Sequence, residues 1–345
     1  MTVHFDCYSF GRPLREIGPM AAEAEDIGFS ALWFTESAHS PFVAAAAAGL
    51  ATERLGVGTN IAVAFPRSPM VTAQVAWDLA QGTGGRFILG LGSQVKAHVT
   101  RRFSTPFSRP AARLAEYVQA VRAIFRSFAG EAPLAFEGEF YQFSLLTDFF
   151  NPGPIDHPDV PIFISAVNPV MAGVAGRVAD GVNVHPLHSV RYLTEVVCPA
   201  VERGAREAGR NPQDVALAVP VFMIAGDVEA DVEATRQSVR RQIAFYGSTP
   251  SYRAVFELHG WNGLSEELGA LQRAGEVATM TARITDEMLD QLSVTAGWND
   301  LARVLVDRYG GVADRIMPYG TAGDWQQQPE LAERWADVAR AVRRG

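Results

Sequence analysis

Side chains that can hold or move a proton follow several short apolar runs of the sequence. Glu36 and His39 come soon after the run 31–34, and His185 follows the run 181–184. Carboxylate and imidazole groups are common general acids and bases in enzymes. Polar residues close other runs in the same way: Asp6, Tyr8, Asn60, Ser93, Gln94, Ser165, Asn168, Asn183 and Tyr319. These positions are candidates for a site, although turn residues are polar in most proteins.

A glycine-rich stretch, RFILGLGSQ at residues 86–94, ends an apolar run in Gly90 and Gly92. Many α/β proteins hold a phosphate at such a turn. The dinucleotide fingerprint requires a third glycine and a helix that opens at once. Here Val95 takes the third position, and the stretch is the fourth predicted strand rather than the first. We therefore favour the end of a barrel strand over a dinucleotide-binding turn.

A second turn, after the run 161–165, precedes a predicted helix. Asn168 is a natural N-cap and Pro169 a natural first helical residue. Free N–H groups at a helix N-terminus bind phosphate, and ordinary capping explains the same two residues. Both interpretations stay open on this pattern alone.

The pair His185 and His188 raises the question of a metal site. No cysteine cluster or HExxH helix accompanies the two histidines. We expect no metal, and we expect His185 to contact a substrate or cofactor. Near the glycine-rich stretch, Lys96, Arg101 and Arg102 form either a solvated face or a patch that attracts an anionic ligand.

The elements that must position these residues are short apolar runs alternating with helical patterns. Such alternation predicts a parallel sheet. Eight units favour a closed (β/α)₈ TIM barrel, with an open doubly wound sheet as the alternative. The predicted strands are Val3–Cys7, Ala31–Phe34, Leu55–Asn60, Arg86–Leu91, Pro161–Ser165, Gly181–Val184, Leu217–Ile224 and Ala313–Met317.

Two segments are additional to the strand–helix units of a simple barrel. We expect the whole chain, residues 1–345, to form a single α/β domain. Residues 129–160, after the fourth strand, include a predicted hairpin at 135–143 that turns at Gly138. Residues 246–297 form a second insertion, after the seventh strand. Long insertions in compact domains often act as lids, so we expect both to roof the active site.

The composition of the chain argues against several classes of protein. The chain has 345 residues, 48% of them hydrophobic, and a formal net charge of −8. An acidic chain argues against a broad nucleic-acid interface. Two cysteines are too few for a disulfide framework, and the longest apolar stretch, 42–51, is too short to span a bilayer. With no signal-peptide pattern at the start, we expect a cytoplasmic protein without a membrane or nucleic-acid partner.

Four segments in order resemble the bacterial-luciferase-like flavin superfamily, and more narrowly its oxidoreductases that depend on the deazaflavin coenzyme F420. The resemblance extends from Val3 to about Tyr319. It rests on GFSALWFTES (28–37), LGVGTNIAVAFPRSPMVTAQ (55–74), GGRFILGLGSQ (84–94) and PIFISAVNPVMAGVAGRVADGV (161–182).

The resemblance implies a place for each part of the cofactor. The family's non-prolyl cis peptide, which backs the ring, would fall at Asn60–Ile61. Gly92, Ser93 and Gln94 would line the ring and its chain. The backbone at Ala166, Val167 and Asn168 would hold the phosphate. The family usually dimerises through helices after strands two and three, which the Ala-rich segment 42–51 would suit.

The resemblance also exposes a departure. Many members carry an Asp-His pair after strand two, where this chain has Glu36-Ser37. Glu36 can still accept a hydrogen bond, but Ser37 cannot act as a base near neutral pH. His39 could take that role. We expect Glu36 and His39 near the reacting centre, and Tyr8 and His185 as substrate contacts.

The expected function is hydride transfer between coenzyme F420 and a small organic substrate. Two alternatives remain: an FMN-dependent monooxygenase of the same superfamily, and a non-catalytic barrel that binds a cofactor.

Overall fold

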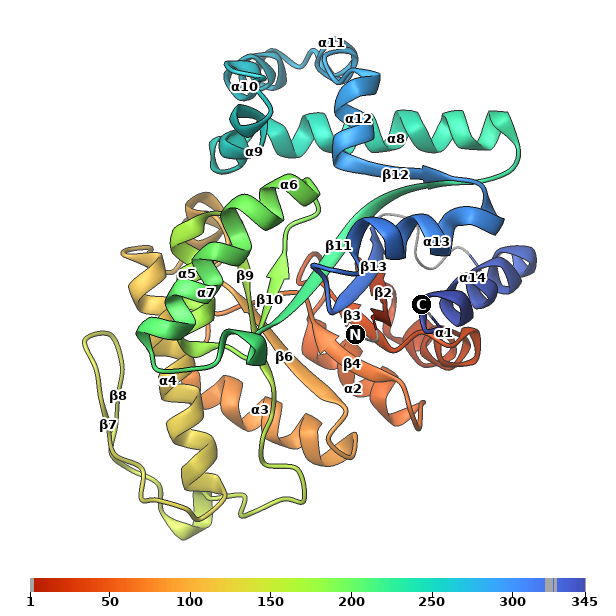
Figure 1. Cartoon of the computed structure of the whole chain (residues 1–345). Coiled ribbons are helices and arrows are strands. Elements are labelled where there is room, and N and C mark those ends of the chain that lie inside the picture. Colours follow the sequence, from red (N-terminus) through yellow and green to blue (C-terminus); the bar gives the residue numbers. More distant parts are fainter. Residues whose placement is uncertain (1–2, 320–324, 326–327, 345) are drawn as a thin grey trace.

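Parallel strands form a barrel at the centre of the computed structural model, which describes residues 3–319, 325 and 328–344 (Figure 1). The strands neighbour one another in the order β1, β13, β11, β10, β9, β6, β4, β3 and β2. Only Asp6 separates β1 from β2, so the sheet closes on itself and the eight-stranded barrel is confirmed. The strands are β1 (His4–Phe5), β2 (Cys7–Ser9), β3 (Ala31–Phe34), β4 (Gly56–Thr59), β6 (Phe87–Gly92), β9 (Ile162–Ala166), β10 (Gly181–Val184), β11 (Ala216–Ala225) and β13 (Arg315–Tyr319).

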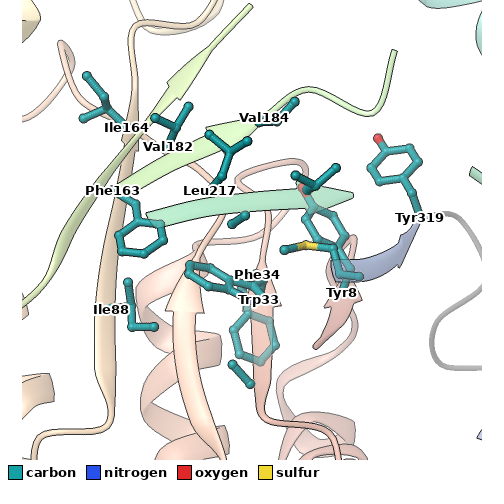
Figure 2. Packing of buried hydrophobic residues seen from close by; sticks show 14 of the residues in the cluster. Tyr8, Trp33, Phe34, Ile88, Phe163, Ile164, Val182, Val184, Leu217 and Tyr319 are labelled. Atoms are coloured by element: carbon teal, nitrogen blue, oxygen red, sulfur yellow. The ribbon is translucent and has the colours of Figure 1, made fainter. Parts of the chain in front are cut away.

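The point of closure is held by a buried ion pair. Asp6 is fully buried, and its two carboxylate oxygens accept hydrogen bonds from Arg315 Nη1 at 2.9 and 2.8 Å. Trp33 Nε1 donates to the same carboxylate at 2.8 Å, and the Trp33 ring packs 5.8 Å from that of Phe163. Figure 2 shows Trp33, Ile88 and Phe163 gathered in the barrel interior. Asp6 therefore joins β13 to β3 across the closure instead of serving a ligand.

Helices cover the outside of the barrel because each has one apolar face. In α4 the buried residues Leu114, Val118, Val121 and Phe125 recur at helical spacing. The outer helices are α1 (Leu14–Ile27), α2 (Pro41–Leu50), α3 (Pro69–Gly82), α4 (Pro110–Phe128), α5 (Pro169–Val178), α7 (Cys198–Glu207), α13 (Trp298–Tyr309) and α14 (Pro329–Val342). Shorter helical segments are η1 (His98–Arg102), α6 (Val190–Tyr192), η3 (Leu193–Val197) and η4 (Pro212–Asp214). The short strand β5 (Ala62–Val63) pairs with β6.

The predicted hairpin in 129–160 exists, but it does not roof the barrel. Strands β7 (Phe136–Glu137) and β8 (Gln142–Phe143) pair, and a short turn, η2 (Asp148–Phe150), follows. Glu116 of α4 accepts hydrogen bonds from three consecutive backbone N–H groups, Glu139 to Tyr141. The hairpin therefore lies along the outside of α4 (Figure 1). The segment follows a helix, so it leaves from the N-terminal end of the barrel, opposite the mouth.

The second insertion does lie at the mouth, and it is longer than predicted. It runs from residue 226 to residue 297, because the helix after β11 belongs to it and α13 is the seventh barrel helix. An insertion that directly follows a strand begins at the C-terminal end of the barrel. In Figure 1 its helices stand together above the barrel. They are α8 (Glu229–Gly247), η5 (Pro250–Tyr252), α9 (Arg253–Leu258), α10 (Leu264–Ala274), α11 (Val277–Ala282) and α12 (Asp286–Leu292). The insertion ends in β12 (Ser293–Ala296), which pairs in parallel with the last four residues of β11.

The expected dimer helices expose several apolar side chains. On α2, Val43 and Leu50 are 51% and 77% exposed, and on α3 Val71 is 49% exposed. The homodimer itself stays a prediction. Within the described residues, no helix combines the length and the apolar character that a membrane crossing requires.

Candidate active site

A cavity of about 340 Å³ opens at the C-terminal ends of the barrel strands. Its volume is in the range of small-molecule sites. Nine of the predicted site residues line it: Tyr8, Glu36, Asn60, Ile61, Ser93, Gln94, Val167, Asn168 and His185. Three others do not, namely His39, Gly92 and Ala166. None of the wall comes from residues 129–160, so that half of the predicted roof is wrong.

One wall of the cavity is a backbone bulge. The peptide bond Asn60–Ile61 is cis, at the position that the resemblance implied. The hydroxyls of Tyr8 and Thr35 both donate to the Asn60 carbonyl oxygen at 2.5 Å. The Glu36 N–H donates to the Ile61 carbonyl oxygen at 3.2 Å. The ends of β2 and β3 thus hold both carbonyls of the bulge.

The Glu36 side chain is occupied within the protein. Its oxygens accept hydrogen bonds from both terminal nitrogens of Arg67, at 2.6 and 2.8 Å, and from the Val63 N–H at 2.6 Å. The side chain is 6% exposed. Both carboxylate oxygens are thus engaged by donors of the protein itself, in the bidentate geometry typical of arginine. Glu36 therefore positions the segment after the bulge.

Ser37, which stands at the position of the missing histidine, and His39, which was expected to take its role, both lie off the wall. The Ser37 hydroxyl donates to the Phe10 carbonyl. His39 is exposed and lies next to Gly11 rather than at the cavity. The structure brings neither side chain into the cavity.

The two glycines of RFILGLGSQ, Gly90 and Gly92, lie where other atoms of the protein pack too closely against the strand to admit a side chain. A Cβ on Gly90 would lie 1.6 Å from the Thr59 carbonyl oxygen. A Cβ on Gly92 would lie 2.8 Å from the Ile61 side chain and 2.7 Å from the Ser165 hydroxyl. Gly92 therefore leaves room for the bulge beside it, and its direct contact with a cofactor stays a prediction. Ser93 and Gln94, the next residues, do line the cavity.

The start of α5 contributes the predicted phosphate turn. Asn168 Oδ1 accepts a hydrogen bond from the Met171 N–H at 3.0 Å, and the Val167 carbonyl accepts one from Tyr192 at 2.9 Å. Ala166 is buried at the end of β9. The Asn168 side chain thus performs ordinary helix capping. Anion binding by this turn stays a prediction.

Another part of the wall is rich in tyrosine. Tyr246 and Tyr252 come from the 226–297 insertion, and Tyr319 ends β13. The hydroxyl oxygens of Tyr246 and Tyr319 lie 2.5 Å apart, and burial raises the pKa of each phenol. The sequence carried a signal for Tyr319, a polar residue at a strand end. It carried none for the two insertion tyrosines, whose place depends on how the insertion folds back.

His185 lies among these tyrosines. Its ring centroid is 4.2 Å from that of Tyr252 and 4.6 Å from that of Tyr246. Burial, and to a smaller extent the neighbouring His188, lowers the pKa of His185 to about 3. The Leu187 N–H donates to Nδ1 at 3.1 Å, so the hydrogen of the neutral ring resides on Nε2. At neutral pH His185 is an uncharged hydrogen-bond donor.

Asn183 is a further wall residue that the strand-end pattern placed among the candidates. Its side chain is 1% exposed, and neither the amide nitrogen nor the amide oxygen has a hydrogen-bond partner in the described part of the chain. Buried amides are normally paired. A ligand with an adjacent donor and acceptor would satisfy this one.

Two contacts fasten the insertion to the loop after β10. His259 Nε2 lies 2.8 Å from the Ser189 hydroxyl. Arg191 donates to the Leu258 carbonyl oxygen at 2.9 Å.

The two histidines considered as metal ligands, His185 and His188, do not face a common point. His188 Nδ1 bonds the His185 carbonyl oxygen at 2.9 Å. The described residues contain no group of three or more histidine, cysteine or acidic residues that could hold a metal.

Comparison with known proteins matches this arrangement to a family. A family model described as luciferase-like monooxygenase matches residues 3–342. A protein of Mycobacterium tuberculosis, described only as uncharacterized, is 43% identical over 310 residues, which are 90% of this chain and 91% of the relative. The F420-dependent glucose-6-phosphate dehydrogenase of Amycolatopsis mediterranei is 28% identical over 303 residues, 83% and 87% of the two chains. In fold, the coenzyme F420-dependent tetrahydromethanopterin reductase of Methanopyrus kandleri superposes with a TM-score of 0.80, at 20% identity and 98% coverage of both chains.

Proposed function

The chain belongs to the luciferase-like monooxygenase family, and from this premise we propose that it is an oxidoreductase that binds the deazaflavin coenzyme F420. The substrate is a small organic molecule. A relative named for its dependence on F420, 28% identical over most of both chains, supports the choice of cofactor. The observation that carries the proposal is the cavity wall itself, in which the bulge, the β6 loop and the start of α5 meet.

The residues of the wall fit a flat heterocycle. The bulge at Asn60–Ile61 offers a backbone surface, and Ser93 and Gln94 adjoin it. The unpartnered Asn183 amide supplies one donor and one acceptor. The pyrimidine edge of a deazaflavin ring alternates carbonyl and N–H groups, which such an amide can match.

When bound, the deazaflavin would supply the exchange of a hydride with the substrate. The protein would position the cofactor and the substrate, and it would supply hydrogen-bond donors. Tyr8 and Thr35 hold the Asn60 carbonyl, and the Glu36–Arg67 pair holds the segment that follows. The 226–297 insertion would exclude water from above. Because Glu36 is occupied and His39 is exposed, we assign the role of hydrogen-bond donor to the substrate to the hydroxyl groups of Tyr246 and Tyr319.

A fluorescence titration of the purified protein with F420, and separately with FMN, tests the proposal. We expect F420 to bind with micromolar affinity or better. Binding of FMN without F420, together with oxygen consumption on reduced FMN, would instead identify a monooxygenase. Tight F420 binding without turnover on alcohols, aldehydes, enones and sugar phosphates would identify a non-catalytic barrel.

A matched variant examines the fit of the ring. Asn183→Leu removes the unpartnered amide at nearly constant volume, so we expect F420 affinity to fall at least fivefold. Folding stability should stay equal or rise, because the amide has no partner within the protein to lose. Asn211→Ala, which removes a cap on the distant turn η4, is the control and should leave F420 affinity unchanged. An unchanged affinity in Asn183→Leu would remove Asn183 from the cofactor site.

A further inference from the structure

We infer that the substrate is an uncharged compound with a flat body and one oxygen atom, a carbonyl or the corresponding alcohol, bound against Tyr252 with its oxygen at His185 and the Tyr246–Tyr319 pair. This inference rests on the proposed function for the reaction, and on the cavity wall for the substrate.

Hydrogen counting at the tyrosine pair shows what it offers a ligand. The two hydroxyl oxygens are 2.5 Å apart, so one O–H donates to the other. Each hydroxyl has a single hydrogen. Whichever tyrosine donates, the second O–H stays available, and both residues line the cavity. The pair therefore presents one hydrogen-bond donor, kept protonated at neutral pH because burial raises the pKa of both phenols.

His185 supplies a second donor. Nδ1 is committed to the Leu187 N–H, so Nε2 carries the hydrogen. Within the described chain, Nε2 makes no hydrogen bond. Two donors and no ionised acceptor at this end of the cavity suit a ligand atom with two lone pairs, which is a carbonyl or hydroxyl oxygen. Donors aimed at such an oxygen also stabilise the negative charge it gains during reduction.

The shape of the wall selects a flat ligand body. The rings of Tyr252 and His185 lie 4.2 Å apart at 32°, and Tyr246 meets His185 edge-on at 86°. Aromatic faces favour stacked or edge-on contact with flat groups. An aromatic or conjugated ligand would extend this stack.

Charge on the wall excludes an ionic substrate. Among the described lining residues Glu36 is the one carboxylate and none is a lysine or arginine, and Glu36 already pairs with Arg67 at 2.6 Å. A phosphate or carboxylate on the substrate would lose its hydration without gaining a cation. We therefore expect uncharged ligands to be preferred.

Isothermal titration calorimetry with four probes tests the substrate class. The probes are acetophenone, ethylbenzene, methyl 4-acetylbenzoate and 4-acetylbenzoate. We expect the methyl ester to bind at least tenfold more tightly than the carboxylate, and acetophenone to bind more tightly than ethylbenzene. Equal affinity for ester and carboxylate, or no measurable binding of any uncharged probe, would overturn the inference.

Variants then separate the donors from mere packing. The double variant Tyr246→Phe with Tyr319→Phe removes both hydroxyls and should weaken acetophenone five- to tenfold. Each single variant should cost less, because the remaining hydroxyl keeps its hydrogen. His185→Phe should also weaken acetophenone while keeping a ring against Tyr252. Ethylbenzene affinity should stay constant throughout; a parallel loss for ethylbenzene would mean that the residues act only through packing.

Tyr309→Phe is the matched control. Its hydroxyl is buried and unpartnered, but Tyr309 does not line the cavity. Acetophenone affinity should not change. The probe titrations run with and without F420, so failure of F420 binding would refute the proposed function while the probe affinities still decide the substrate class.

Discussion

The replacement Gly90→Ala tests the account of the glycine-rich strand most sharply. The added Cβ would lie 1.6 Å from the Thr59 carbonyl oxygen, whereas real Cβ contacts are 3.0 Å or longer. The obstacle is backbone, so β4 and β6 must separate by about 1.4 Å. That movement breaks both hydrogen bonds between Thr59 Oγ1 and Gly90, at 2.6 and 2.9 Å.

The expected loss of stability follows from these contacts. Overpacking of a tight core costs about 1–3 kcal/mol or more, and each lost hydrogen bond about 1 kcal/mol. We expect the free energy of unfolding to fall by about 5 kcal/mol, which is comparable with the whole stability of a marginal domain. Urea unfolding followed by circular dichroism measures it as a lower midpoint at constant slope.

Two further glycine variants make the measurement decisive. In Gly92→Ala the obstacles are the Ile61 and Ser165 side chains, which can yield, so the loss should be smaller. Gly82 ends α3 with nothing within 4 Å, so Gly82→Ala should be neutral or slightly stabilising. If Gly90→Ala unfolds within about 1 kcal/mol of the parent protein, the close approach of the two strands is wrong.

Two other predictions concern buried ionisable side chains. Arg67→Met leaves Glu36 buried without its partner, so stability should fall by about 3–5 kcal/mol and recover in part when Glu36→Gln is added; no recovery in the double variant, measured by urea unfolding, would contradict the pairing. Burial lowers the pKa of His185 to about 3 and that of His188 to about 4, so the unfolded chain binds more protons below pH 6.5. Stability is therefore full above pH 6.5 and should fall by about 2 kcal/mol per histidine by pH 5. His188→Asn should flatten this fall and the exposed His98→Asn should not; equal slopes for both variants would refute it.

Local patterns of the sequence were sufficient for the strands of the barrel, whereas its closure depends on the pairing of β1 with β13. Each strand is an apolar run between helical patterns, and both periods are properties of neighbouring residues. The same local reasoning located Asn60, Ser93 and Gln94, because residues at the ends of parallel strands meet at one mouth, and the family resemblance added Ile61. All four line the cavity.

The hairpin at 129–160 was predicted correctly as a hairpin and wrongly as a roof. Its turn residues signal a hairpin, but its position depends on Glu116, which binds three of its backbone amides. A loop after a helix also begins at the opposite end of the barrel from a loop after a strand. The order of the elements along the chain therefore indicates at which end of the barrel an insertion begins, whereas the length of the insertion does not.

The sequence by itself determined the strands, their alternation with helices and most of the residues at the barrel mouth, because apolar periodicity and strand ends are local. Only the tertiary structure decided which side chains are free to act. Glu36 is taken by Arg67, 31 positions away, and His39 stays exposed. Tyr246 and Tyr252 reach the wall because the 226–297 insertion folds back over the mouth. Such pairings depend on contacts between residues distant in the chain, and no local spacing encodes them.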